Sequence, residues 1–424
     1  MALAALALAA PLAAAPPPPL LRISGPPAPP PPPVSAKTVP RIFLSSDGET
    51  VYIVGPVMGD AFLRFDALLQ RALKVKRVFL ASPGGLTLEG RLIAALVRKR
   101  RLDTYVGAYC ASACTQVFVA GRERVLGPEG ELGFHQAVGV DQTGETSAIA
   151  AASTRRLTPL SVFGINGNDT LRLAYEQAGI DTPFIAKALA RGHEDMWLPT
   201  TSELIASNVI TRRAEQPEIA PPEGSRTRAE ITALLQQRPI WRAAQKSLPK
   251  AYAEGLGDAW RRVNTGSGLE NAITSGRAAI VIAAWPLLAD SDDAMLDRMI
   301  TLYAKSARVQ RAKGYPMCKE TLDDEDVRMN PLDAWFESTE DGLLIELMGS
   351  APRGKGLSVK DARKIFERDV APVMIRSFLS TDVKSTSASC RLGFKIFETI
   401  NELPANKRIR AYRALLSLPE MGET

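Results

Sequence analysis

The chain has 424 residues, of which 46% are hydrophobic, and it carries a formal net charge of +6. This length and this hydrophobic content allow a sizeable core and suggest two or three domains. The charges are dispersed, and the one dense basic cluster, at residues 98–101, is typical of a solvated helix end, so we expect no nucleic-acid partner.

The N-terminal segment has the composition of an export signal. Residues 1–15 are almost entirely Ala and Leu and end in three alanines, as in a secretory signal peptide, although no Lys or Arg precedes the apolar stretch. A low-complexity tail or an upstream start are the alternatives. This run and the next longest one, 278–289, are both too short to cross a bilayer, so we expect no stable transmembrane span. We therefore expect a periplasmic or otherwise exported protein.

A Pro-rich stretch at 16–40 should form an extended spacer, and a globular pattern begins at residue 41. Short apolar runs then alternate with amphipathic stretches, which indicates βαβ units and a largely parallel sheet. The sequence thus predicts an α/β domain over 41–213. The expected strands are 51–57, 77–82, 103–108, 124–126 and 131–135, and the expected helices are 60–73, 87–99, 112–120, 169–191 and 201–207.

The second half of the chain has a different pattern. Residues 214–226 are predicted to be a linker because of their proline content, and residues 227–424 are predicted to form a mainly helical domain. No catalytic motif occurs there, so we expect an interaction or accessory domain. The helices expected in it include 227–237, 240–262, 292–311, 358–379, 392–402 and 405–416.

The four cysteines fall into a close pair, Cys110 and Cys114, and a distant pair, Cys318 and Cys390. In an oxidising compartment the natural partition is a local bridge plus a bridge that closes the C-terminal domain, but the sequence leaves all three pairings open. A local bridge would be strained if residues 110–114 were fully helical. Buried small apolar residues are the alternative interpretation of these cysteines.

Two short motifs follow predicted strands, where ligands collect in parallel α/β sheets. In ASPGG (81–85), Gly84 and Gly85 let the backbone turn sharply and offer bare N–H groups, although a tight turn explains them as well. In ASA (111–113), Ser112 stands where a strand runs into a helix. There it suits a nucleophile, with the N–H of Ala113 at the helix N-terminus facing a developing oxyanion; a helix N-cap is the alternative.

A third motif, GFHQ, places His135 at the end of a predicted strand, and the chain has only two histidines. It is the only general base that follows the serine on the same predicted sheet, although an isolated histidine is usually structural. His135 would accept the proton of Ser112 during attack on a peptide carbonyl, while the N–H groups of Gly85 and Ala113 hold the oxyanion.

Taken in order, SPGG (82–85), ASA (111–113) and HQ (135–136) resemble the proteolytic subunit of Clp protease, a member of the Clp/crotonase fold. The resemblance covers residues 45–212 and implies a ββα spiral domain with serine peptidase activity. It also implies an acidic third member of a triad before an aromatic-Leu step. Asp195, two residues before Trp197, takes this place, with Glu194 as its neighbouring competitor.

Other features separate the chain from that family. Residues 137–168 look inserted where the family has its oligomer or substrate contacts, so the expectation of a homo-oligomer is left open. We expect an exported peptidase that hydrolyses peptides or unfolded proteins without ATP, a metal or another cofactor. The alternatives are a non-catalytic envelope scaffold, a Ser–Lys protease like signal peptide peptidase with Lys187 as the base, and acyl-CoA chemistry of the crotonase type.

Overall fold

The structure is a computed structural model that describes residues 40–137, 167–192, 195–314, 331–350, 354, 356–372, 374–375 and 386–418. The described residues belong to two compact units. The first holds those up to 284 together with 331–350, and the second holds 285–314 and those from 354 onward.

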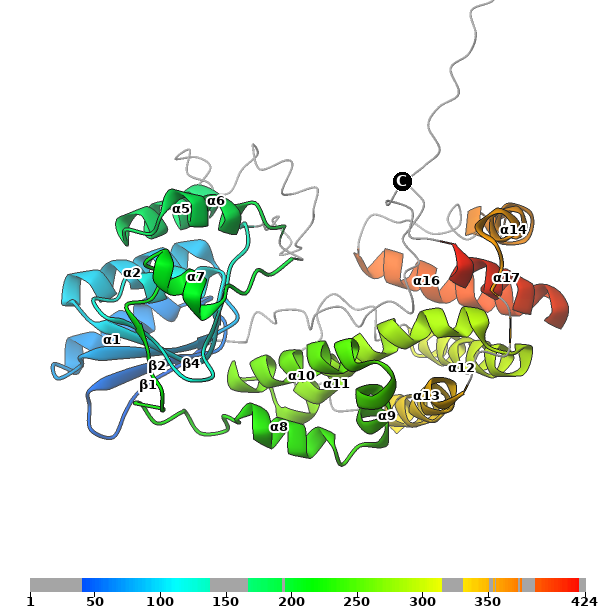
Figure 1. The fold of residues 1–424 in the computed structure, drawn as a ribbon, viewed down its shortest axis with the longest axis horizontal. Helices are drawn as coiled ribbons and strands as arrows, with labels where there is room; N and C mark the ends of the chain where they lie inside the picture. Colours follow the sequence, from blue (N-terminus) through cyan, green and yellow to red (C-terminus); the bar gives the residue numbers. More distant parts are fainter. Residues whose placement is uncertain are drawn as a thin grey trace, which may run out of the picture. The chain divides into compact units, whose positions relative to one another are not determined.

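A seven-stranded sheet lies in the first unit, with the order β1-β2-β3-β4-β5-β7 and with β6 paired to β4 (Figure 1). Only β1 and β2 are antiparallel, and the other pairs are parallel, so the predicted, largely parallel sheet is confirmed. The strands are β1 (Arg41–Leu44), β2 (Thr50–Val54), β3 (Arg77–Ser82), β4 (Asp103–Ala111), β5 (Arg124–Leu126), β6 (Glu131–Gly133) and β7 (Arg212–Arg213).

Strand β4 is long enough to pair with two strands in succession. Its first half, at residues 104–106, pairs with β5, and its last three residues, 109–111, pair with β6. Because β4 and β6 are parallel, the segments that follow them leave the sheet side by side. The N–H of Ser112 accordingly donates to the carbonyl oxygen of Gly133 at 3.0 Å.

The sheet buries both faces, as expected for parallel strands in an α/β protein. Alternate residues of β2, such as Val51 and Ile53, join the main core beneath the helices, and Tyr52 and Val54 join a smaller core on the other face. The helices that follow the strands are α1 (Ala61–Arg71), α2 (Thr87–Arg100), α3 (Ala113–Val119), α5 (Gly167–Gln177), α6 (Thr182–Leu189) and α7 (Thr201–Ala206).

Further helices complete the first unit: α8 (Arg228–Leu235), α9 (Pro239–Ser247), α10 (Pro249–Asn264), α11 (Leu269–Ala284) and α13 (Pro331–Gly349). Helices α10 and α11 cross where Gly255 and Gly276 meet. A Cβ on Gly255 would lie 2.4 Å from the carbonyl oxygen of Gly276, so only glycine permits this approach. Together with the sheet domain, these helices confirm the predicted class, an α/β domain followed by a mainly helical part.

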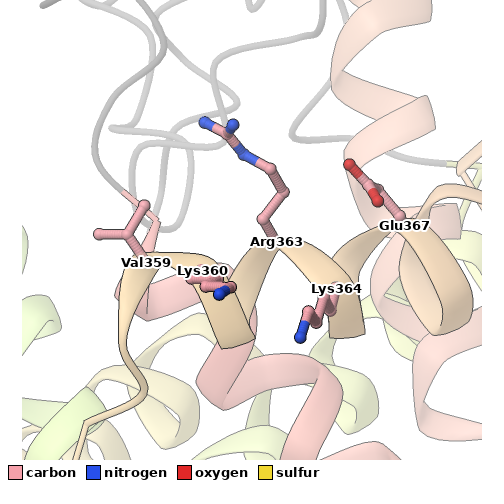
Figure 2. A pocket seen from close by; sticks show the side chains of 5 residues that line it. All are labelled: Val359, Lys360, Arg363, Lys364 and Glu367. Carbon is pink, nitrogen blue, oxygen red and sulfur yellow. The ribbon is translucent and has the colours of Figure 1, made fainter.

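Among its described residues, the second unit has helices joined by turns and no strand. They are η2 (Trp285–Asp290), α12 (Asp293–Ala312), α14 (Val359–Ile365), the π-helical turn η4 (Phe366–Val370), α16 (Thr386–Asn401) and α17 (Ala405–Ser417). An open hollow on α14 and η4 is lined by Val359, Lys360, Arg363, Lys364 and Glu367 (Figure 2).

Prolines divide two of the predicted helices. The expected helix 169–191 is α5 followed by α6, and Gly179 adopts a φ of 72° between them. Pro183 lies in the first turn of α6, which the side chain of Asp181 caps. The expected helix 240–262 is likewise α9 and α10, and Pro249 opens the second helix because proline fits the first helical position.

The segment Leu269–Asp290, which comprises α11 and η2, is long and apolar enough to cross a membrane by length and composition. Its Arg277 forms ion pairs with Glu340 at 2.6 Å and with Asp341 at 2.5 Å, both on α13. Core helices of soluble proteins pass the same test, so the expected lack of a stable transmembrane span stays a prediction.

Candidate active site

Ser112 is the turning point between β4 and α3. Its φ of 52° and ψ of −126° lie outside the regions that residues other than glycine normally adopt. Such a conformation costs on the order of 1–3 kcal/mol and persists only when the surrounding structure fixes it. The residue is partly exposed, whereas Ala111 and Ala113 on either side are buried.

The hydroxyl of Ser112 is not used as a helix cap. Ser112 occupies the N-cap position of α3, but its side chain makes no capping hydrogen bond. Its carbonyl oxygen instead accepts from the N–H of Thr115 at 2.9 Å and from the Thr115 hydroxyl at 2.6 Å. The helix-cap interpretation of the hydroxyl therefore has no support.

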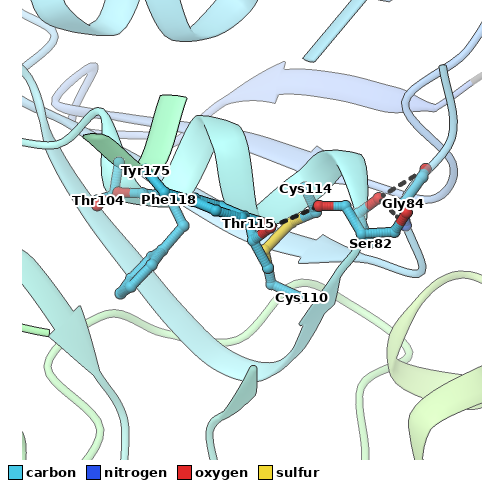
Figure 3. Close-up of a disulfide and its surroundings, with 9 residues drawn as sticks. Ser82, Gly84, Thr104, Cys110, Cys114, Thr115, Phe118 and Tyr175 are labelled. Atoms are coloured by element: carbon cyan, nitrogen blue, oxygen red, sulfur yellow. Dashed lines mark hydrogen bonds between the residues drawn. A yellow bond between two sulfur atoms is a disulfide. The ribbon is translucent and has the colours of Figure 1, made fainter. Parts of the chain in front are cut away.

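Of the two glycines in the SPGG motif, Gly84 passes directly beside Ser112, and Gly85 packs against the backbone of Val57. Gly84 has a φ of 111° and Gly85 a φ of 143°. A Cβ on Gly84 would lie 2.6 Å from the Cβ of Ser112 and 2.9 Å from the carbonyl oxygen of Ala111. The N–H of Gly84 donates to the Ser82 hydroxyl at 3.1 Å, which holds the turn (Figure 3).

Gly85 and Ala113 were predicted to receive an oxyanion with their backbone N–H groups, and this role stays a prediction. The N–H of Val57 donates to the carbonyl oxygen of Gly84, and the N–H of Leu86 donates to the carbonyl oxygen of Val57. In this parallel bridge between Val57 and Gly85, the N–H of Gly85 therefore points away from Val57. In the described part of the chain no backbone acceptor takes up the Gly85 N–H. The N–H of Ala113 is at the start of α3, where the helix itself supplies no acceptor and its dipole favours negative charge.

His135 follows β6 and is partly exposed. Its backbone neighbourhood is fixed on both sides, because Phe134 and Trp197 exchange two hydrogen bonds of 2.9 Å and the N–H of Gln136 donates to Arg191 at 2.9 Å. Because the N–H of Ser112 donates to the carbonyl oxygen of Gly133, the backbone segments of Ser112 and His135 lie side by side where β4 and β6 end. The predicted proton transfer between their side chains stays a prediction.

Asp195 lies two residues before Trp197, which forms an isolated bridge with Phe134, the residue before His135. The N–H of Asp195 donates to the carbonyl oxygen of Gly192 at 3.0 Å, and its carboxylate forms an ion pair with Arg191 at 2.8 Å. Its side chain is 65% exposed. The orienting role of Asp195 thus remains a prediction, and Glu194, its competitor, lies outside the described residues.

Lys187 is engaged by two side chains. Its ammonium donates to Glu203 at 2.8 Å and lies 4.1 Å from the ring centroid of Trp197. The hydrogen bond from Lys187 is the main reason why the pKa of Glu203 is lowered to about 2. A lysine held in this way suits a structural role better than that of a base in a Ser–Lys dyad.

Cys110 and Cys114 form a disulfide with a Cα–Cα distance of 5.4 Å, and both are fully buried (Figure 3). Cys110 lies on β4 and Cys114 lies on α3, so the strain expected of a bridge within one helix does not arise. Cys318 lies outside the described residues, and so does the side chain of Cys390 on α16. Their predicted bridge stays a prediction.

Tyr175, which sequence analysis did not single out, packs behind the serine turn. Its hydroxyl lies 2.7 Å from the Thr115 hydroxyl, and burial raises its pKa (Figure 3). Tyr175 lies on α5, 60 residues from Thr115, so no local pattern in the sequence could have revealed this contact. Among the described residues, no cluster of three or more His, Cys, Asp or Glu side chains could hold a metal ion.

Comparison with known proteins finds similarity at the level of structure. No family model matches, and no curated protein matches. Solved structures do match, over about two fifths of the chain. ClpP1 from Listeria monocytogenes is similar at 18% identity and a TM-score of 0.30, over 41% of this chain and 94% of that one. A mutant of the 1510-N membrane-bound stomatin-specific protease is similar at 14% identity and a TM-score of 0.29, over 45% and 82%.

Proposed function

We propose that the chain is an exported serine peptidase in which Ser112 is the nucleophile. The observation that carries this proposal is the conformation of Ser112: a partly exposed serine with a φ of 52°, whose hydroxyl caps nothing. A glycine would relieve the strain at this position. The strain therefore favours a serine that is present for its hydroxyl, since such outliers cluster at active sites.

The neighbouring groups support hydrolysis of an acyl bond. His135 would remove the proton of Ser112 as it attacks a peptide carbonyl, and would then give this proton to the leaving amine. The N–H groups of Gly85 and Ala113 would hold the oxyanion, each lowering the barrier by about 3 kcal/mol. Asp195, or its neighbour Glu194, would fix the tautomer of the imidazole.

The buried disulfide supports the export proposal, because such bonds persist in oxidising compartments and are rare in the cytosol. Outside the cytoplasm, hydrolysis would proceed without ATP. We propose peptides or unfolded proteins as substrates, cleaved without a metal or cofactor.

The test uses protein that begins at residue 41 and a fluorophosphonate probe, which labels only activated serines. We expect labelling and slow hydrolysis of unstructured peptides by the wild type. Ser112→Ala and His135→Ala should each abolish hydrolysis, and the double variant should be no worse, because the members of a triad act as a unit. Asp195→Asn should lose less. Ser225→Ala, at another partly exposed serine, is the matched control.

Two outcomes would contradict the proposal. Full hydrolysis by Ser112→Ala would exclude both the triad and a dyad with Lys187, because both need this serine. A wild type that is folded but neither labelled nor active would leave the non-catalytic scaffold as the function to retain.

A further inference from the structure

We propose that the Cys110–Cys114 disulfide is a clamp that holds Ser112 in its reactive backbone conformation. The proposal rests on the proposed function, because it assigns the two cysteines as positioning residues for that nucleophile. The two sulfur atoms react with nothing; they act through the conformation of the residue between them.

The bridge spans the turn symmetrically. Cys110 lies two residues before Ser112 and is in register with Leu132 of β6, and Cys114 lies two residues after Ser112 in the first turn of α3. The disulfide therefore ties the end of the strand directly to the start of the helix. Ser112 is the middle residue of the covalent ring that the disulfide closes between Cys110 and Cys114.

This ring restricts how the turn can relax. If Ser112 rotated to a negative φ, the start of α3 would point in a different direction relative to β4. A disulfide accepts Cα–Cα distances of only about 4.4–6.8 Å, and the present distance is 5.4 Å. Relaxation would have to move both Cys110 and Cys114 within a packed core, where each side chain is 0% exposed.

The hydrogen bonds of the turn are weaker restraints than the bridge. The N–H of Ser112 donates to Gly133, and its carbonyl oxygen accepts from Thr115. Each of these hydrogen bonds contributes only a small net stabilisation, whereas the disulfide is covalent. The disulfide is therefore the strongest single restraint on the strained turn.

The burial of the bridge indicates a permanent clamp and not a redox switch. Both cysteines lie inside the main core, so a reductant reaches them only after local unfolding. The bridge also joins residues only four positions apart, and short loops remove little chain entropy from the unfolded state. Global stability is therefore the smaller part of what this disulfide can contribute.

The first experiment measures the rate of fluorophosphonate labelling in the double variant Cys110→Ala/Cys114→Ala. We expect a rate at least about tenfold below that of the wild type, which corresponds to about 1.4 kcal/mol. Val117→Ala is the matched control, because it also removes buried volume from α3 but keeps the bridge. Labelling of the double variant at the wild-type rate, well below its unfolding temperature, overturns the proposal.

The second experiment does not depend on catalysis. It compares the unfolding temperatures of Ser112→Gly and Ser112→Ala, with and without the bridge. With the bridge, glycine should be the more stable by roughly 2–4 °C, because it relieves the strain of a positive φ. Without the bridge the turn relaxes, and this advantage should disappear.

The two experiments separate the clamp from the proposed function. An equal glycine advantage in both backgrounds shows that the bridge does not hold the conformation, which overturns the proposal. A bridge-dependent glycine advantage in a protein that is never labelled supports the clamp and defeats only the assignment of Ser112 as a nucleophile.

Discussion

Ser112 and Gly84 approach each other at the end of β4, and both have backbone conformations that suit glycine. At Gly84 the residue matches the requirement, since its φ is 111° and it has no side chain to meet the Cβ of Ser112. At Ser112, by contrast, a serine occupies a conformation that normally requires glycine. A local conflict of this kind is expected where chemistry and not folding selects the residue.

Gly84→Ala tests how closely these two segments must approach. The new Cβ would lie 2.6 Å from the Cβ of Ser112, so either the SPGG turn or the serine turn must move. We expect a loss of stability of about 2–4 kcal/mol and loss of fluorophosphonate labelling.

Gly224→Ala is the matched control for this variant. Gly224 has a φ of 90°, but no atom lies within 4 Å of its Cβ position. It should therefore show only the cost of the positive φ, about 1 kcal/mol, with unchanged labelling. Equal losses in the two variants, measured by denaturant unfolding, would mean that the close approach to Ser112 is unimportant.

At the scale of single residues, the sequence identified the segments that meet but not the state of each side chain. Ser112, Gly85 and His135 could be singled out because small or rare residues follow predicted strands. The φ of Ser112 has no sequence signal, because serine normally avoids this region. The ion pair of Asp195 with Arg191 competes with the predicted role, and its i,i+4 spacing alone could not decide between them.

Among the elements, β6 links the sheet to two of the helices that follow it. The carboxylate of Glu131 contacts the guanidinium of Arg228 on α8 and that of Arg261 on α10, the latter at 2.8 Å. Each arginine also stacks on an aromatic ring, Arg228 on Trp260 at 4.0 Å and Arg261 on Tyr109 at 5.6 Å. Burial raises the pKa of Tyr109 to about 12, so this ring is neutral at physiological pH.

Glu131→Gln should weaken the contact between β6 and these helices. The Glu131 side chain is 25% exposed and serves two arginines, so we expect a loss of about 1–3 kcal/mol, between the values for surface and buried pairs. The control is Glu270→Gln, because Glu270 pairs with Arg238 but is 61% exposed. Its loss should be about 0–1 kcal/mol. Equal losses in chemical denaturation would show that the Glu131 pairs contribute no more than a surface pair.

Helix α7 supplies a pH-dependent contact. Glu203 closes a capping box with Thr200 and accepts a hydrogen bond from Lys187 on α6. The folded-state pKa of its carboxyl is lowered from 4.5 to about 2, first by Lys187 and then by Thr200. A lowered pKa stabilises the fold above pH 4.5, and this contribution is lost as the pH falls toward 2.

The expected result is a stability that falls on acidification through this window, measured as the unfolding temperature between about pH 6 and about pH 2.5. Glu203→Gln should unfold at a lower temperature than the wild type at the upper end of this range and should lose less on acidification. Lys187→Met should also reduce the acid dependence, because it removes the main cause of the shift. An unchanged acid dependence in Glu203→Gln would refute the assignment.

Elements were predictable to the extent that their patterns are local. The alternation of strands and helices predicted β3 and β5 at their observed bounds. The helix breaks before Pro183 and Pro249 were missed, because the apolar pattern continues from one helix into the next at both places. The contacts of Glu131 join residues 97 and 130 positions apart, and nothing in the local sequence specifies such partners.

At the scale of the whole molecule, the proline-rich segment of the sequence and the boundaries of the compact units suggest different divisions of the chain into domains. Residues 214–226 were predicted to be a linker, and the domain boundary there stays a prediction. Within that segment, Ala214 and Ile219 are buried in the smaller core of the sheet, and the Tyr52 hydroxyl donates to the carbonyl oxygen of Ala220 at 2.9 Å. One boundary between the two compact units falls between residues 284 and 285, inside a mainly apolar stretch.

The division into two units predicts two unfolding transitions in calorimetry of the chain from residue 41. Ile400 on α16 and Ile93 on α2 are each 0% exposed, one in each unit, which makes them a matched pair. Replacement of either by alanine should cost about 2–5 kcal/mol, because each leaves a cavity in a packed core. Ile400→Ala should lower only one transition temperature and leave fluorophosphonate labelling of Ser112 unchanged.

Ile93→Ala should lower the other transition. Labelling should disappear at the temperature of that transition, because Cys110 and Cys114, on either side of Ser112, belong to the same core as Ile93. The order of events on heating therefore reports which unit holds the site. A single transition that both variants lower by the same amount would show that the two units unfold cooperatively. In that case the helices of the second unit contribute to the stability of the candidate site even though none of its predicted residues lies among them.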